Sequence, residues 1–232
     1  DSRPFVFTQD RGLEYALLVL VLDQDKMEVN GLACGGWQPL GAFHTITKSK
    51  GNVVYEIDGI PALDCVAKYG GISLEKARSE TGDRTNAIEY FIRTGSLFQL
   101  ELHREGKSPI MRAATFGSFE EKYLVFGGTV PEGSRVIFSI LPGFDTTDNL
   151  IREYEKYHEQ KPEAEAVILF SCSGRDISIG PWMEEEIVRI NNIWKSPMAG
   201  FFTYGEIGPD GSGQTDFHNL TCSLLLLSEK PT

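Results

Sequence analysis

Two short, mostly apolar segments, residues 15–22 and residues 164–170, decide which fold class this chain can adopt. Neither approaches the roughly 20 apolar residues that a membrane-spanning helix needs. Both are dense in Val, Ile and Leu and have the length of an ordinary strand. Each is therefore predicted to be a buried β-strand. The chain is expected to be soluble and to have no membrane partner.

Two further segments are predicted to be helices, because each has a residue that favours a helix start followed by a stripe of apolar residues. Asp145 or Thr146 can cap a helix over residues 145–158, and Pro181 opens a helix over residues 181–194. The glutamates at 184–186 lie near the positive end of this second helix and are expected to be solvated. Further strands, with Gly and Pro breakers between them, are predicted at 43–48, 53–58, 97–103, 110–115, 123–127, 135–140, 199–204 and 221–227. Together the pattern predicts an α/β (α+β) protein with mixed, largely antiparallel sheets and flanking helices.

The net charge and the spacing of the cysteines indicate which kinds of binding partner the chain is expected to lack. The net charge of −11 at pH 7 argues against nucleic acid and anionic membrane surfaces. The four cysteines are scattered, without a Cys-x-x-Cys pair and without His at metal-ligand spacing, so no metal site is expected. The chain does not begin with Met and has no secretory pattern at its start, and we expect an excised piece of a reduced, cytoplasmic protein.

Polar residues follow the buried strands in three loops, residues 171–176, 205–209 and 217–221. An α/β protein places its functional residues in such loops, at the ends of strands. The loops are expected to converge on one site that contains Cys172, Arg175, Glu206, His218 and Asn219.

These loops also carry a resemblance to a known family. Residues 199–209 (AGFFTYGEIGP), followed by 217–221 (FHNLT), resemble the end of the C-terminal domain of the FIST sensory family. Residues 172–175 (CSGR) resemble its Cys-x-Gly-Arg motif, and residues 36–41 (GWQPLG) resemble the end of its N-terminal domain. The resemblance implies that residues 1–72 are the end of a FIST N-terminal domain, whose start would lie upstream. Residues 73–232 would be a FIST C-terminal domain.

The resemblance implies a sensory module that binds a small ligand and acts on a signalling output protein or domain such as a histidine kinase. Amino acids are the ligands proposed for the family. The residues agree with this expectation, because Arg175, or Arg112 from the neighbouring strands, can hold a carboxylate with a two-pronged contact. Glu206 would bind an ammonium group and Asn219 would bridge. Such a site suits a small zwitterion.

Three alternatives remain open. A Cys-dependent hydrolase or transferase would use Cys172 as nucleophile, His218 as base and Glu206 to orient that base. A docking module would present a flat apolar patch. A haem-based gas sensor, as reported for some family members, would use His44 or His218 as axial ligand. Neither histidine lies in an apolar pocket by its sequence context, and we expect no haem and no other cofactor.

Overall fold

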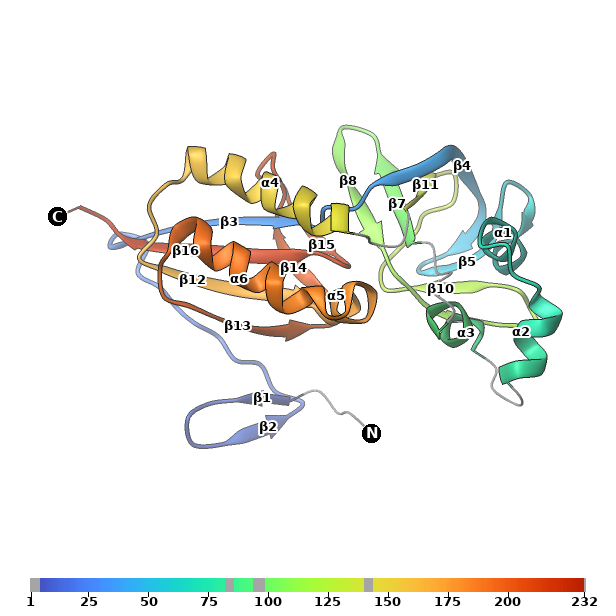
Figure 1. The fold of residues 1–232 in the computed structure, drawn as a ribbon, viewed down its shortest axis with the longest axis horizontal. Helices are drawn as coiled ribbons and strands as arrows, with labels where there is room; N and C mark the ends of the chain where they lie inside the picture. Colours follow the sequence, from blue (N-terminus) through green and yellow to red (C-terminus); the bar gives the residue numbers. More distant parts are fainter. Residues whose placement is uncertain (1–4, 82–85, 94–98, 140–143, 232) are drawn as a thin grey trace.

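The structure, a computed structural model, describes residues 5–81, 86–93, 99–139 and 144–231. Two lobes lie end to end (Figure 1). One contains an eight-stranded sheet with helices α1–α3, and the other contains a four-stranded sheet with helices α4–α6. This arrangement confirms the predicted α+β class with largely antiparallel sheets. Among the described residues, no helix combines the length and hydropathy needed to cross a bilayer.

The eight-stranded sheet has the strand order β8-β7-β11-β4-β5-β10-β9, with β6 paired to β5. All its pairings are antiparallel. The strands are β4 (Pro39–Lys50), β5 (Val53–Ile57), β6 (Ile60–Pro61), β7 (Gln99–Arg104), β8 (Lys107–Arg112), β9 (Ala114–Gly117), β10 (Leu124–Phe126) and β11 (Arg135–Ser139). The strands predicted at residues 43–48 and 53–58 are confirmed, and they pair with each other as β4 and β5.

Helices α1 (Ala62–Tyr69), α2 (Leu74–Thr81) and α3 (Ala87–Arg93) belong to this lobe. Helix α1 follows Pro61, which has the extended backbone of a residue that precedes a helix, and buries Leu63 and Val66. Helix α3 buries Ile88 and Phe91 in the same apolar core. Strands on both sides of the expected domain boundary, between residues 72 and 73, share the sheet.

The four-stranded sheet has the order β13-β12-β16-β3. Strands β12 and β13 are parallel, and the other two pairings are antiparallel. Strand β3, near the start of the chain, pairs along its length with β16, near the end. The strands are β3 (Met27–Cys34), β12 (Ala166–Cys172), β13 (Met198–Thr203) and β16 (Cys222–Glu229).

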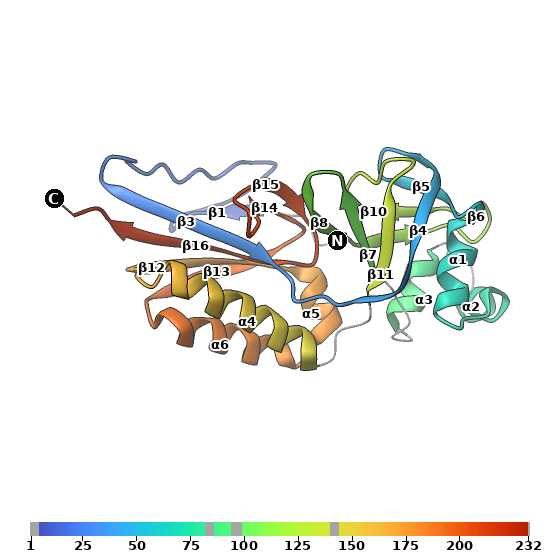
Figure 2. The same cartoon turned by 90° about the horizontal axis from the view of Figure 1, so that it is seen from above.

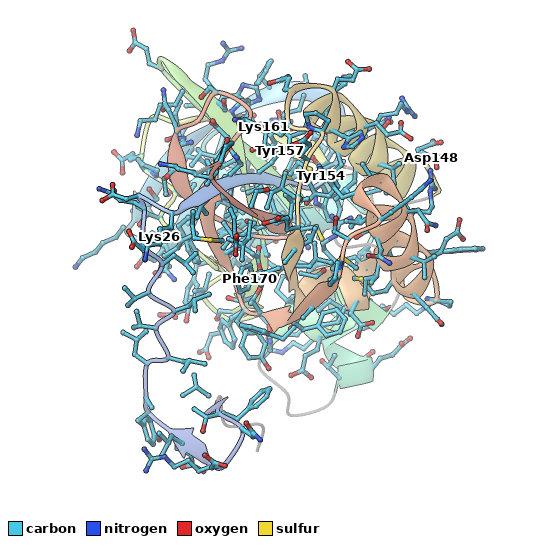
Figure 3. All side chains as sticks on the ribbon, turned by 90° about the vertical axis from the view of Figure 1, so that its left-hand side faces the viewer. Lys26, Asp148, Tyr154, Tyr157, Lys161 and Phe170 are labelled. Atoms are coloured by element: carbon cyan, nitrogen blue, oxygen red, sulfur yellow. The ribbon has the colours of Figure 1, made fainter. Side chains whose placement is uncertain are left out.

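Helices cover one face of this sheet and a hairpin covers the other (Figure 2). Helices α4 (Phe144–Gln160) and α6 (Trp182–Trp194) confirm the two helices predicted from sequence. The short helix α5 (Ser173–Ile179) follows β12 directly, and the hairpin consists of β14 (Glu206–Pro209) and β15 (Thr215–His218). Figure 3 shows Tyr154 and Tyr157 on the sheet side of α4. Their hydroxyls donate to the carbonyls of Cys222 and Gly31, which attaches the helix to two strands.

The prediction for residues 15–22 was wrong. The segment forms no strand, and its large apolar side chains between Tyr15 and Val21 are 58–95% exposed. It follows the small hairpin of β1 (Phe5–Phe7) and β2 (Gly12–Glu14) and leads to β3. Figure 3 shows the side chains of this blue segment extending away from the body of the protein. An apolar run predicts burial only if another element packs on it, and no described residue pairs with this one as a strand.

Candidate functional site

A cavity of about 350 Å³ lies where the two lobes meet. Cavities of roughly 300–1,000 Å³ hold small-molecule ligands in proteins. One wall comes from α3, β7, β9 and neighbouring loops, and the other from the β12–α5 turn and the segment between β15 and β16. The described lining residues are Ile88, Ile92, Gln99, Ala113, Ala114, Thr115, Gly127, Cys172, Ser173, Gly174, Ile177, Ser178, Tyr204, Asn219 and Leu220. The three loops identified from sequence therefore each contribute to, or lie beside, one cavity.

Cys172 is the last residue of β12 and lines the cavity. Its exposed fraction is 5%, and its backbone N–H donates to the carbonyl of Thr221 at 3.0 Å. Burial raises the pKa of the Cys172 thiol, and the nearby carboxylate of Glu206 raises it further. The thiol therefore stays protonated at neutral pH and donates a hydrogen bond to Glu206.

Glu206, the first residue of β14, lies behind Cys172 and does not line the cavity. Its side chain is 3% exposed. The hydroxyl of Thr203 donates to one carboxylate oxygen, and the hydroxyl of Thr221 donates to the other at 2.8 Å. Burial raises the pKa of Glu206, although these donors oppose the shift. The carboxylate is thus engaged by protein donors, and the expected contact with a ligand ammonium group does not fit this position.

Arg175 is fully buried and does not line the cavity. It donates to both carboxylate oxygens of Glu186, Nε at 3.0 Å and Nη2 at 2.5 Å. Its Nη1 donates to the carbonyls of Gly35 at 2.7 Å and Leu220 at 3.0 Å. The expected two-pronged contact of Arg175 therefore exists, but it holds a protein carboxylate instead of a ligand.

Arg112 also donates its hydrogen bonds to protein groups. It is 5% exposed, and its Nε donates to the carbonyl of Thr129 at 3.1 Å. Its Nη1 donates to the carbonyls of Met111 and Phe217, at 3.0 and 3.1 Å. Burial lowers the pKa of Arg112 to about 10, so the guanidinium remains charged at neutral pH. Arg112 is not a lining residue, and its predicted contact with a carboxylate does not fit the structure.

His218 and Asn219 are adjacent but face different surroundings. The Nε2–H of His218 donates to the carbonyl of Gly208 at 3.0 Å, inside the β14–β15 hairpin, and burial lowers the pKa of this imidazole. Asn219 lines the cavity. Its Oδ1 accepts the N–H of Ala113 at 3.3 Å, and its Nδ2 donates to the carbonyl of His218 at 3.1 Å. A Cβ at Gly127 would lie 2.8 Å from Asn219 Oδ1, so a glycine is needed opposite the amide.

Cys172 and Asn219 are thus the predicted site residues that face the cavity. The lining residues that sequence reasoning missed are mostly small or apolar, and they come from both lobes. Gln99 is the polar example: it is 4% exposed, and its Oε1 accepts the N–H of Ala114 at 3.0 Å. A neutral glutamine inside a strand carries no sequence signal that distinguishes it from other strand residues.

Leu220 connects the cavity to the segment that joins the lobes. Its side chain lines the cavity, and its backbone has φ of 59°, a left-handed conformation that is uncommon for leucine. Its carbonyl accepts hydrogen bonds from Arg175 and, at 2.8 Å, from the indole Nε1 of Trp37. Trp37 lies between β3 and β4, where the chain passes from one lobe to the other. Leu220 therefore contacts both the cavity and, through this hydrogen bond, the segment that joins the lobes.

The arrangement expected for a Cys-dependent enzyme is not formed by the described side chains. Cys172 donates to Glu206, whereas the Nε2 of His218 is engaged by Gly208. A raised thiol pKa also opposes nucleophilic attack, because the thiolate is the reactive form. For metal binding, the described residues contain no group of three or more His, Cys, Asp and Glu side chains suited to an ion.

Comparison with known proteins finds matches to two domain models of one family. The FIST N domain matches residues 1–60, and the FIST C domain matches residues 62–209. An uncharacterised protein of Mycobacterium bovis is 22% identical over 194 residues, which cover 82% of this chain and 48% of that protein. An uncharacterised protein of Mycobacterium tuberculosis is 24% identical over 194 residues, which cover 82% of this chain and 49% of that protein.

The chain spans about half the length of the curated relatives it matches. No solved structure matches the chain. FIST domains are described as sensory, ligand-binding domains. Because the C-domain match alone extends over more than half of the residues, this chain belongs to the FIST family.

Proposed function

We propose that this chain is the small-ligand-binding module of a sensory protein and that its ligand binds in the cavity between the two lobes. The observation that carries the proposal is the cavity itself, whose walls come from both lobes. A ligand that contacts both lobes favours the arrangement of the lobes that it fits best, and so shifts the population toward that arrangement. Such a shift is what a sensory module transmits.

The route to an output begins at Leu220 in this proposal. Leu220 contacts the cavity and, through Trp37, the connection between the lobes. The output itself is proposed to be a signalling protein or domain, such as the histidine kinase that the family resemblance implies. We further propose that the module acts in the cytoplasm, which is supported by the free state of all four cysteines.

An amino acid or similar zwitterion was expected as ligand because Arg175 and Glu206 were expected to face it. Both charges are engaged by protein groups outside the cavity. The proposal therefore keeps a small molecule as ligand without this pair of ionic contacts.

A thermal-shift screen of small molecules tests the proposed site. A ligand at about 100 times its Kd stabilises the folded protein by roughly 2.7 kcal/mol. For a chain of this size each kcal/mol raises Tm by ~2–4 °C. Ala113→Leu places a larger side chain in the cavity and should abolish the shift, whereas Ala42→Leu adds the same side chain at an exposed position of β4 and should retain it. A library without hits, or hits indifferent to Ala113→Leu, would contradict the proposal.

A further inference from the structure

The cavity is built to hold an uncharged molecule, and this inference rests on the proposed function of the cavity. No described residue that lines it carries a charged side chain. Its polar groups are two amides, Gln99 and Asn219, together with hydroxyls and the thiol of Cys172. The rest of the lining is aliphatic or backbone, apart from the ring of Tyr204. A charged ligand group would lose its hydration on entering this cavity, and the described lining residues offer no opposite charge to compensate for that loss.

The charged side chains that sequence predicted to face a ligand cannot be turned toward the cavity without breaking buried contacts. Arg175 holds Glu186, and neither side chain is exposed to solvent. Arg112 donates three hydrogen bonds to backbone carbonyls. Glu206 lies behind Cys172 and accepts from Thr203 and Thr221. Removing either arginine from its acceptors would leave polar groups buried without partners, and a carboxylate at Glu206 repels an anion in the cavity.

The two amides are fixed in a way that leaves donors for the ligand. The oxygen of Asn219 accepts the N–H of Ala113, and the oxygen of Gln99 accepts the N–H of the next residue, Ala114. The oxygens of both amides therefore accept from two adjacent backbone N–H groups where β8 passes into β9. The NH₂ group of Asn219 donates one of its two N–H groups to the carbonyl of His218. The NH₂ group of Gln99 has no acceptor among the described residues. The remaining N–H groups match an acceptor on the ligand.

We propose that the ligand is a small uncharged carbonyl compound, of the carboxamide type, on an apolar skeleton. Its carbonyl oxygen accepts from Gln99 and Asn219. Its skeleton packs against Ile88, Ile92, Ile177 and Leu220. The zwitterionic ligands expected from sequence are disfavoured because both of their charges lack a partner.

A matched set of probes tests the ligand class. Isovaleramide, isovalerate, isopentylamine and leucine share a branched apolar skeleton and differ in charge. Each is titrated into the whole chain and its affinity is measured by calorimetry or ligand-observed NMR. Isovaleramide is expected to bind at least tenfold more tightly than the other three, and Ala113→Leu is expected to abolish its binding.

Gln99→Glu sharpens the test because it keeps the acceptor for Ala114 and replaces the NH₂ donors with a negative charge. In this variant the affinity for isovaleramide should fall at least tenfold, and the affinity for isopentylamine should rise. Gln160→Glu, at an exposed position at the end of α4, makes the same change outside the cavity and should leave both affinities unchanged.

Two results would overturn the ligand class. Cavity-dependent binding of leucine or isovalerate at an affinity equal to that of isovaleramide would overturn it and leave the proposed function intact. Absence of cavity-dependent binding by all four probes would also overturn it, and the wider thermal-shift screen then decides the proposed function separately. If Gln99→Glu does not fold, the affinities of the four probes for the unmodified chain still decide the ligand class.

Discussion

Arg175 and Glu186 form a two-pronged ion pair in which neither side chain is exposed to solvent. Glu186 lies on α6 and also accepts a hydrogen bond from Thr147 on α4 at 3.2 Å. Arg175 lies on α5 and reaches the carbonyls of Gly35 and Leu220. The pair therefore connects three helices to the segment between the lobes and to one wall of the cavity.

Removing one partner of this pair should be strongly destabilising, because the other charge is left buried. Arg175→Ala and Glu186→Ala are each expected to cost about 3–5 kcal/mol, measured by urea unfolding. The partly exposed pair of Arg189 and Asp148 provides the control, and Arg189→Ala should cost about 1 kcal/mol or less. Equal costs for the buried and exposed arginines would show that the buried pair is not the structural connection described above.

The raised pKa of Glu206 predicts the direction in which the unfolding free energy changes with pH. Burial raises this pKa, so the folded state retains the proton to a higher pH than the unfolded state does. The stability contributed by the protonated form is complete below about pH 4.3 and is lost as pH rises through the raised pKa. The unfolding free energy of the wild type, minus that of Glu206→Gln, should therefore fall as pH rises.

Urea titrations between pH 4 and pH 8 measure this difference. Glu163→Gln removes a charge at an exposed position and serves as the matched control. A difference that is constant over the pH range, or that rises with pH, would refute the prediction.

The Cys172 thiol should react slowly with alkylating reagents at neutral pH. Burial raises the pKa of this thiol, and so does the carboxylate of Glu206, which keeps the thiolate scarce. Glu206→Gln removes the negative charge and should accelerate alkylation by about tenfold for each unit by which the thiol pKa falls. Peptide mass spectrometry after timed exposure to iodoacetamide measures the rate. An unchanged rate would show that Glu206 does not control this thiol.

Asp58 should stabilise the chain above acidic pH. Burial alone would raise its pKa, but hydrogen bonds from the imidazole of His44 at 2.6 Å and the backbone N–H of Thr45 at 2.8 Å outweigh it and lower the pKa. This contribution is present above about pH 3.9 and is lost as pH falls through the lowered pKa. Asp58→Asn tests it well, because asparagine tolerates the backbone φ of 52° at this position. The advantage of the wild type in unfolding free energy should shrink on acidification, and a pH-independent advantage would contradict the assignment.

The exposed segment of residues 15–22 should bind hydrophobic dyes and promote self-association, since large exposed apolar surface has this effect. Leu18→Lys combined with Leu20→Lys should lower dye fluorescence and sedimentation-detected association. The unfolding free energy should change by about 0.5 kcal/mol or less per substitution, because both side chains are mostly exposed. Gln24→Lys adds a charge nearby without removing apolar surface and should leave dye binding unchanged.

Elements with local signals could be predicted from sequence. Helices α4 and α6 begin close to their expected starts, because caps, Pro181 and apolar stripes are short-range features. The parallel pairing of β12 with β13 agrees with the expectation that their loops converge.

Features that depend on distant partners could not be predicted in this way. Glu186 was expected to be solvated with its neighbours, and it is buried because Arg175, eleven residues earlier, lies opposite it. Residues 15–22 have the composition of a buried strand, but burial requires another element to cover them. One wall of the cavity comes from neutral residues of the other lobe, such as Ala114 and Gln99, and no pattern in the chain marks them.

The pairing of β3 with β16 has a consequence for the order in which the protein forms during its synthesis. The strands of the eight-stranded sheet lie together within residues 39–139, so this lobe can assemble as soon as that stretch has left the ribosome. Strand β3 is made earlier but has to wait for β16. At ~5–20 residues per second this wait lasts on the order of ten seconds or longer. During this interval β3 remains without its partner strand in the nascent chain, and the last strand to emerge closes the lobe.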